Sequence, residues 1–378
     1  MPDIKIIHTA DLHIGANENF LEQRAAARRA ETLLTFERIM DTAKDNDVKL
    51  VLIAGDLLNS NKIEHSFIES ICDKMRNTKE VQVVFSAGNH DPLNAESPFL
   101  KLRLPDNFHI LKAKDDCIEF KELSVRVYGR SFAEVYEKGC ERFSITPKND
   151  DFINLMCIHG DLSSNTDSDY NAITDGFISN SGMDYIALGH IHKRTDIGKL
   201  GDTNFSYCGC PEGQGFDEAG AKGIYMGTVS KQSVNLEFVP LCRRMHLIEN
   251  VDISSLSTSA EISEKILSYI SAKHGDTASE NLYKINLCGE ISEDCEINIP
   301  EILSRVSEKV YFAKIKDKTA ALVNIDLLKN ENSLRGIFVK NMLNRIENAQ
   351  GEDKEKLYAA LNLGLKAFKS EVSYNENQ

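Results

Sequence analysis

Histidine, aspartate and asparagine side chains that could bind metal ions recur in short clusters along the first half of the 378-residue chain. Each cluster includes a glycine or lies close to one, and together they are Asp11-Leu12-His13, Gly55-Asp56, Gly88-Asn89-His90-Asp91, His159-Gly160 and Gly189-His190-Ile191-His192. Imidazole nitrogens, carboxylates and an amide oxygen form a ligand set that suits manganese, iron or zinc better than calcium or a thiolate-bound metal. These residue types therefore predict a metal centre.

Taken singly, none of the clusters identifies a site. A Gly-Asp pair is common in turns, where the aspartate hydrogen-bonds its own backbone, and an isolated His-x-His is more often structural than metal-binding. Their repetition after five strand-like segments argues against coincidence. The other histidines lack this context and are interpreted as structural or surface residues: His8, His65, His109, His246 and His274.

Short apolar runs precede the clusters and predict the elements that must position them. Runs rich in Val, Ile and Leu, typical of strands buried on both faces of a layered α/β sheet, cover residues 4–9, 50–54, 81–86, 153–158 and 185–188. Residues 20–45 have the apolar spacing of a helix, which gives a strand–helix–strand order. Because ligands bind where strand ends meet at one edge of such a sheet, we expect the clusters to converge there.

The remaining segments predict further strands and helices. Alternating apolar residues predict antiparallel strands over 108–128 and a hairpin over 225–239, and later segments predict a strand at 281–287, a helix at 300–309 and a strand at 310–316. Amphipathic helices are expected over 334–348 and 353–372, joined near Gly351 and followed by a polar tail, 373–378. We therefore divide the chain into a first domain over 1–240, a small α+β domain over 241–330 and a helical segment over 331–378.

The order of the clusters resembles that of the calcineurin-like metallophosphoesterases, D-x-H, G-D, G-N-H-D/E, H and G-H-x-H. The resemblance implies an α/β fold built on a layered β-sandwich flanked by helices, with a smaller capping domain and C-terminal helices. It also implies a binuclear metal centre. One metal would be held by Asp11, His13 and His192, the other by Asn89, His159 and His190, and Asp56 would bridge the two. His90 would contact the phosphate or the leaving group, with Asp91 adjacent to orient it.

The expected chemistry is hydrolysis of a phosphoester. Two dications about 3.5 to 4 Å apart lower the pKa of a shared water and stabilise the phosphate oxygens on which charge develops. The departing alkoxide needs a proton, which an imidazole near neutral pKa can supply, and His90 is the candidate.

Further segments are similar to DNA-repair exonuclease subunits of the SbcD and YhaO type. The similarity covers residues 8–15, residues 207–218 with their Phe-Asp-Glu ending, residues 220–223 and parts of the C-terminal helices. It implies a manganese-dependent DNA phosphodiesterase, with zinc or iron as alternative metals, that works with an SbcC-like or YhaN-like coiled-coil ATPase. The small domain would then limit access to the metals.

Two other functions remain open. The formal net charge of −14 favours a phosphodiesterase of small or cyclic nucleotides, because it has the wrong sign for binding nucleic acid by bulk electrostatics. The second alternative is a scaffold for an ATPase in which the metals are structural. An intact His90 argues for an enzyme, and a turnover assay distinguishes an enzyme from a scaffold.

The chain departs from the family pattern at three positions. Asn59 stands where archaeal and eukaryotic relatives carry a second functional histidine, which bears on the strength of nuclease activity but not on metal binding. Cys208 and Cys210 replace residues that are more often Pro and Ser or Thr. A redox role is one interpretation, but buried packing is favoured because so short a spacing would strain a disulfide.

Basic residues near the clusters could form a local rim for DNA: Arg24, Arg28, Arg29, Lys193 and Arg194. The alternative is a solvated helix face whose arginines pair with Glu22 and Glu31. We expect a cytoplasmic protein without a membrane span, because no signal-peptide core or apolar run of about 18 residues is present. The nine cysteines lack a C-x-x-C pair and are expected to be reduced.

Apolar stripes on the last two predicted helices must be buried somewhere. They comprise Leu334, Ile337, Phe338, Met342, Leu343 and Ile346, and then Leu357, Leu361, Leu365 and Phe368. We expect these helices to dock the ATPase. Packing on the chain's own capping domain or pairing into a homodimer are the alternatives.

Overall fold

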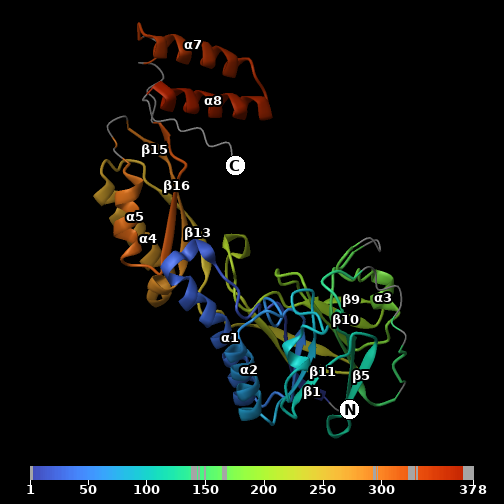
Figure 1. Cartoon of the computed structure of the whole chain (residues 1–378). Helices are drawn as coiled ribbons and strands as arrows, with labels where there is room; N and C mark the ends of the chain where they lie inside the picture. The colour runs from blue at the N-terminus through green and yellow to red at the C-terminus, as the bar shows by residue number, and fades with distance from the viewer. Residues whose placement is uncertain are drawn as a thin grey trace. The chain divides into compact units, whose positions relative to one another are not determined.

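The computed structural model describes residues 3–137, 143, 145–148, 150–163, 168–292, 295, 297–321, 328 and 331–368. The chain divides into two compact units, Met1–His246 and Leu247–Gln378 (Figure 1). The structure is mixed α/β with several sheets flanked by helices, as predicted from the family resemblance. No helix in the described part of the chain is long and apolar enough to cross a membrane.

The first sheet of unit 1 has six strands in the order β12-β11-β1-β2-β3-β4. These are β1 (Asp3–Thr9), β2 (Leu50–Ala54), β3 (Gln82–Ser86), β4 (Phe108–Ile110), β11 (Gly223–Ser230) and β12 (Val234–Pro240). Strands β1 to β4 are parallel, whereas β11 pairs antiparallel with β1 and with β12, which forms the predicted hairpin.

Two helices cover the outer face of this sheet. Helix α1 (Ala25–Asp45) follows a short 3-10 helix (Asn19–Arg24), and α2 (His65–Asn77) follows β2. Side chains such as Phe36 of α1 and Ile71 of α2 pack against Ile7, Val51 and Phe85 of the strands. The helix begins later than residue 20, since residues 19–24 adopt the tighter 3-10 turn instead.

The second sheet also has six strands, in the order β5-β6-β7-β8-β10-β9. They are β5 (Asp116–Phe120), β6 (Val125–Arg130), β7 (Ile153–His159), β8 (Tyr185–Gly189), β9 (Gly198–Leu200) and β10 (Thr203–Tyr207). The short helix α3 (Asp175–Ser179) is capped by the Thr174 side chain. Residues 108–128 do not extend one sheet, because β4 closes the first sheet and β5 and β6 begin the second.

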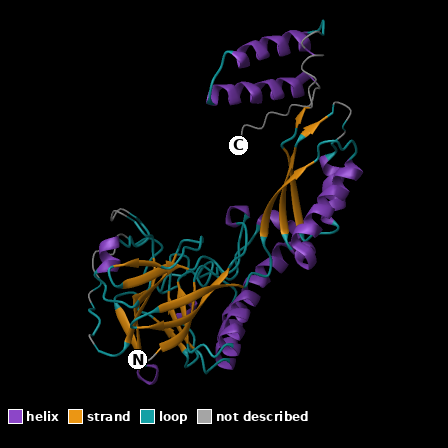
Figure 2. Cartoon of the chain, turned by 180° about the vertical axis from the view of Figure 1, so that it is seen from behind, coloured by secondary structure: helices purple, strands orange, loops and turns teal. Residues whose placement is uncertain are grey.

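The two sheets of unit 1 pack face to face (Figure 2). Alternate residues of a strand point to opposite faces, so that Ile6 faces Val127 and Leu155 of the second sheet while Ile7 faces the helices. Burial on both faces explains the continuous apolar runs of these strands.

Unit 2 contains a three-stranded sheet with two helices. Its elements are β13 (His246–Asp252, whose first residue belongs to unit 1), α4 (Ser259–His274), β14 (Leu282–Cys288), α5 (Ile299–Ser307) and β16 (Phe312–Asp317), with two short paired strands, β15 (Glu290–Ile291) and β17 (Ala320–Ala321). The sequence did not predict α4, although a capping box between Thr258 and Glu261 starts it.

The last two helices form a hairpin, with α7 (Leu334–Glu347) beside α8 (Glu352–Phe368) (Figure 1). Ser333 caps α7, and Gly351 has a φ of +58° in the turn between the helices. The predicted end of the second helix at residue 372 and the tail 373–378 lie outside the described residues.

Candidate metal centre

The predicted metal ligands and the predicted catalytic residue His90 all follow or end strands of unit 1. Asp11 and His13 follow β1, Asp56 follows β2, and Asn89 and His90 follow β3. From the second sheet, His159 is the last residue of β7, and His190 and His192 follow β8. Three groups of these side chains have ligand atoms within 4.8 Å of one another: Asp11–His13–His192, Asp11–Asp56–His159 and His13–Asp56–His90.

The Asp56 carboxylate lies at the middle of the site. Its Oδ2 is 3.7 Å from Nε2 of His13 and 3.5 Å from Nε2 of His159. Its Oδ1 accepts a hydrogen bond of 2.9 Å from the backbone N–H of His90. This carboxylate therefore faces both halves of the predicted ligand set.

One half of the site is formed by Asp11, His13 and His192. The Nε2 atoms of the two imidazoles are 3.0 Å apart. The Asp11 oxygens accept hydrogen bonds of 3.0 and 3.2 Å from the backbone N–H of His190, which holds the carboxylate toward the two rings. Three potential ligand atoms thus converge.

The other half contains Asn89, His159 and His190. His159 donates from Nδ1 to the carbonyl of Ala54 at 2.8 Å, and its Nε2 lies 3.0 Å from Oδ1 of Asn89. The centroid of the His190 ring lies 5.2 Å from that of His159, and His190 belongs to none of the three groups above.

The donor and acceptor pattern fits bound cations. Because His159 donates from Nδ1, its Nε2 presents a lone pair to the Asn89 amide oxygen, which is also an acceptor. Asp11 and Asp56 are 0% and 2% exposed, and within the described residues no lysine or arginine pairs with either carboxylate. Buried charges need a partner, and divalent ions held by these groups would supply it.

The backbone of the ligand loops adopts a rare conformation at four of the predicted ligands. The φ angles are +53° at Asp11, +45° at His13, +51° at Asp56 and +106° at His190. Positive φ is disfavoured for residues with a side chain and tends to occur where function requires it. Four of the nine non-glycine residues with positive φ in the described part of the chain are therefore predicted metal ligands.

Two glycines allow the ligands to approach each other. A Cβ on Gly55 would lie 2.0 Å from Nδ1 of His159, and a Cβ on Gly88 would lie 2.2 Å from Oδ1 of Asp56. Any larger residue would displace the ligand side chain. These contacts explain why glycine accompanies the aspartate and the asparagine in the clusters.

Burial sets the protonation of the site. It lowers the pKa of His13 to about 3 and that of His190 to about 4, so both rings are neutral at pH 7 and offer lone pairs to a metal. Burial also raises the pKa of Asp11 to about 6 and that of Asp91 to about 7. Nearby cations would favour the charged carboxylates.

His90 is the exposed member of the constellation. Its Nδ1 donates to the backbone carbonyl of Asn59 at 3.1 Å, and the centroid of its ring lies 4.6 Å from that of the His13 ring. Asp91 was expected to orient His90, but its oxygens accept the backbone N–H groups of Leu58 (2.9 Å) and Gly88 (2.8 Å). Asp91 therefore ties two ligand loops together, and the main chain of Asn59 orients the His90 ring.

Two residues that were not predicted as site residues support the ligands. Glu218, in the short 3-10 helix Phe216–Glu218, accepts a hydrogen bond from Nδ1 of His192. The Asn171 side chain donates to the carbonyl of His159 at 2.7 Å. Glu218 ends the Phe-Asp-Glu segment that resembles the exonuclease subunits, whereas nothing in the sequence indicates a role for Asn171.

The two cysteines near Glu218 are buried and reduced. Cys208 packs in the core between the sheets, and Cys210 Sγ lies 3.6 Å from Oε2 of Glu218. Burial raises the pKa of both thiols well above the usual value, which makes them poor nucleophiles. These observations support the packing interpretation.

The predicted basic rim is wrong at Arg28, which is 1% exposed. Its guanidinium pairs with Glu18 (2.7 Å), Glu31 (3.1 Å) and Glu212 (2.7 Å), so its charge is neutralised inside unit 1. Arg29 is half-buried and paired with Glu64. The exposed members of the predicted rim are Arg24, Lys193 and Arg194.

Known proteins resemble about half to two thirds of this chain. Residues 4–194 match the family model described as calcineurin-like phosphoesterase. The uncharacterized metallophosphoesterase YhaO of Bacillus subtilis is 30% identical over 253 residues, covering 63% of this chain and 60% of that protein. The DNA double-strand break repair protein Mre11 of Methanopyrus kandleri is 26% identical over 274 residues, covering 65% of this chain and 59% of the relative.

The chain thus spans about 60% of the length of these two curated relatives. Among solved structures, a purple acid phosphatase from yellow lupin seeds matches with a TM-score of 0.33 and 15% identity, covering 54% of this chain and 43% of that one.

Proposed function

Since the chain belongs to the calcineurin-like metallophosphoesterases, we propose that it is a metal-dependent phosphodiesterase that cleaves DNA. The observation that carries the proposal is the convergence of two ligand groups on the Asp56 carboxylate, with the exposed His90 ring beside them. Such an arrangement can hold two divalent ions next to a group that exchanges protons.

We assign the ligands according to the two halves of the site. Asp11, His13 and His192 would hold one ion, Asn89, His159 and His190 the other, and Asp56 both. Ions bound there supply Lewis acidity, which lowers the pKa of a water molecule and stabilises charge on the phosphate. Manganese is the proposed metal, with zinc or iron as alternatives, since imidazole and carboxylate ligands accept all three.

The His90 side chain is assigned to the leaving group. Its Nδ1–H is held by the Asn59 carbonyl, so the imidazolium form carries its transferable proton on Nε2. Transfer of that proton to the departing oxygen leaves a neutral ring that still donates from Nδ1. The main-chain carbonyl of Asn59 thus fixes the tautomer of His90. This contact does not require the histidine side chain that some relatives have at this position.

DNA is proposed as the substrate because the YhaO and Mre11 relatives match the chain well beyond the metal motifs, and Mre11 is a DNA double-strand break repair protein. The net charge of −14 requires that contacts with DNA be local. Arg24, Lys193 and Arg194 are the exposed basic residues proposed for such contacts. Unit 2 from Leu247 would provide the capping domain.

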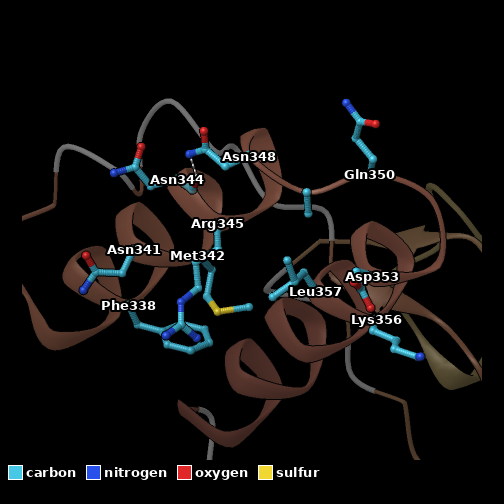
Figure 3. Close-up of a pocket in the computed structure, with 11 residues that line it drawn as sticks. Phe338, Asn341, Met342, Asn344, Arg345, Asn348, Gln350, Asp353, Lys356 and Leu357 are labelled. Atoms are coloured by element: carbon cyan, nitrogen blue, oxygen red, sulfur yellow. Dashed lines mark hydrogen bonds between the residues drawn. The ribbon is translucent and has the colours of Figure 1, made fainter.

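We further propose that the α7–α8 hairpin docks a partner, a coiled-coil ATPase of the SbcC or YhaN kind. The helices bury part of their stripes against each other, through Val339, Met342, Ile346, Leu361 and Leu365. Leu334 and Ile337 remain 77% and 59% exposed. A groove of about 1380 Å³, lined by Phe338, Met342, Arg345 and Leu357 among others, lies between α7 and the first turns of α8 (Figure 3).

The decisive experiment measures turnover by the purified full chain with manganese, zinc or iron. We expect hydrolysis of bis(p-nitrophenyl) phosphate and of labelled DNA with an added metal and none with a chelator. Activity on cyclic or linear dinucleotides without activity on DNA would favour the small-nucleotide alternative. No hydrolysis of any diester, despite bound metal, would favour the scaffold alternative.

The partner proposal is tested by removing residues 331–378. The truncated chain should keep its metal and its turnover but no longer co-purify with the ATPase. Aggregation or loss of metal would show that the hairpin belongs to the core of the protein. If the full chain is a dimer in solution and the truncated chain is a monomer, the hairpin forms a homodimer contact instead.

A further inference from the structure

A row of aromatic rings leads from the metal centre to the surface of unit 1. The centroid of the His159 ring lies 5.2 Å from that of His190, and the His190 ring lies 4.9 Å from that of Tyr170. The Tyr170 ring in turn lies 5.8 Å from that of Tyr136. These spacings are those of direct aromatic contacts. His159 is fully buried, whereas Tyr136 is 65% exposed.

The two tyrosines are fixed to each other and to the site by the backbone. Glu137 donates its N–H to the carbonyl of Asp169 at 2.8 Å, and Asn171 donates to the carbonyl of Glu137 at 2.7 Å. The Asn171 side chain donates to the carbonyl of His159. Tyr170 thus lies between Asp169, which is bonded to Glu137, and Asn171, which is bonded to Glu137 and to His159, so the main chain holds the two tyrosines next to each other and next to the metal site.

The surroundings of the tyrosines suit a flat, uncharged ligand group better than a phosphate. Residues 131–137 and 161–173 contain no lysine or arginine. Among the described residues, the charged side chains closest to the tyrosines in the sequence are acidic: Glu134, Glu137, Asp161 and Asp169. Basic residues flank them: Arg130 donates to Oδ1 of Asn171 at 2.9 Å and pairs with Asp115, and Lys138 follows Glu137 in the sequence. Val135 and Leu162 add exposed apolar surface. Acidic groups repel phosphates, but they do not oppose stacking of an aromatic base on a ring face.

We propose that Tyr136 and Tyr170 form a stacking platform for the nucleobase next to the scissile phosphate. The inference rests on the proposed phosphodiesterase function and specifies its substrate as a nucleotide chain whose base is unpaired. The metal centre holds the phosphate, and the tyrosine platform holds the adjoining base. Stacking accepts any base because each has a π face, so the platform selects unpaired strands rather than a sequence.

The platform also explains how an acidic protein can hold a nucleic acid. Binding through phosphate–lysine contacts weakens steeply with salt, whereas stacking depends little on ionic strength. We therefore expect stacking of a single base on the tyrosines to contribute a large part of the affinity for an unpaired strand. Duplex DNA should bind less well because its bases are already stacked and paired.

The test uses fluorescence anisotropy with the full chain, manganese and a short labelled oligothymidylate whose phosphorothioate linkages resist hydrolysis. A single abasic nucleotide is moved along the strand. Removing the critical base should weaken binding to the wild type by about 5- to 150-fold, the range of one base–aromatic stack. Tyr136→Ala should weaken binding of the intact strand by a similar factor, and Tyr136→Phe should retain it.

The two changes should not add. In Tyr136→Ala the abasic nucleotide should weaken binding less than it does in the wild type, since part of the stacking contact is already lost and only Tyr170 remains. Leu100→Ala serves as the matched control, because Leu100 is also an exposed apolar side chain of unit 1. An abasic effect of full size in Tyr136→Ala, or wild-type binding by that variant, would overturn the proposal.

Two further measurements are needed. The first distinguishes a nucleic acid strand from a small nucleotide as the source of the base, and the second tests the phosphodiesterase proposal independently of the platform. Competition by a linear dinucleotide as effective as by the strand would place a small nucleotide on the platform, whereas poor competition supports a strand. Hydrolysis of bis(p-nitrophenyl) phosphate by the wild type tests the phosphodiesterase alone. Failure of that reaction with intact stacking would refute the function but not the platform.

Discussion

Glu218 accepts a hydrogen bond from Nδ1 of His192, although 26 residues separate them and Glu218 lies outside the segment that matches the phosphoesterase family. The bond fixes a proton on Nδ1 and leaves the lone pair on Nε2, which lies 3.0 Å from Nε2 of His13. Burial disfavours the charged His192 ring, but the hydrogen bond to Glu218 and the negative charges of Asp11, Glu218 and Asp56 together outweigh it and raise the pKa of His192. A carboxylate in this position orients a metal-binding imidazole and increases its basicity.

Replacing Glu218 with Gln should lower metal affinity about 10- to 100-fold, because the amide N–H₂ can donate to Nδ1 and favour the tautomer that protonates Nε2. Manganese binding followed by calorimetry measures the change. Asp217→Asn is the control, since the neighbouring Asp217 is exposed. Equal affinity in Glu218→Gln and the wild type would show that the bond does not orient His192 for a metal.

Loss of the Asp56 charge should remove metal from both halves of the site. Asp56→Ala and Asp56→Asn are both expected to lose bound ions, since this carboxylate lies within 4 Å of His13 and His159. Asp56→Asn keeps an oxygen that can accept the His90 N–H, so it separates loss of charge from loss of the loop contact. Elemental analysis near the wild-type metal content in both variants would refute the assignment of Asp56.

Replacing His90 with Gln should leave metal binding intact and lower turnover by about 100- to 10,000-fold, the usual contribution of general acid–base catalysis. Metal content and hydrolysis of a diester with a poor leaving group are the measurements. A diester with an activated leaving group should be affected less, because its oxygen departs without a proton. Loss of metal would instead identify His90 as a ligand.

The strand ends and most candidate ligands could be predicted because buried strands are uniformly apolar and stop at polar clusters. Other features depend on contacts that sequence spacing does not reveal. Arg28 was predicted on a surface rim, but it is buried against Glu18 and Glu212, which lie 10 and 184 residues away in the sequence. The positive φ angles of Asp11 and Asp56 follow from the geometry of the loops and cannot be predicted from the residue types alone.

The buried Arg28 network should be a major source of stability. Arg28→Ala would leave Glu18 and Glu212 buried without their main partner, and removal of one member of a buried ion pair costs about 3 to 5 kcal/mol. Urea denaturation at neutral pH measures the loss of unfolding free energy. Arg24→Ala, at an exposed position of the same segment, should change it by no more than about 0.5 kcal/mol. A similar small change in Arg28→Ala would contradict the role given to the network.

The α7–α8 hairpin depends on a close contact between Gly364 and Phe338. A Cβ at position 364 would lie 2.2 Å from Cζ of Phe338, so Gly364→Ala must push the ring or the helices apart. In an open helix this substitution would stabilise by about 1 kcal/mol, whereas an overpacked contact costs about 1 to 3 kcal/mol. The sign of the effect therefore reports whether the helices pack as described.

Hydrogen exchange of the α7 and α8 amides gives the required local measurement, since it detects opening of the hairpin without unfolding of unit 1. Gly364→Ala should accelerate exchange in both helices, and combining it with Phe338→Ala should restore slower exchange because the shorter side chain makes room. The single Phe338→Ala variant measures how much the loss of the ring alone changes hydrogen exchange in the two helices. Slower exchange in Gly364→Ala than in the wild type would show that ordinary helix propensity prevails and that the two helices do not meet at this point.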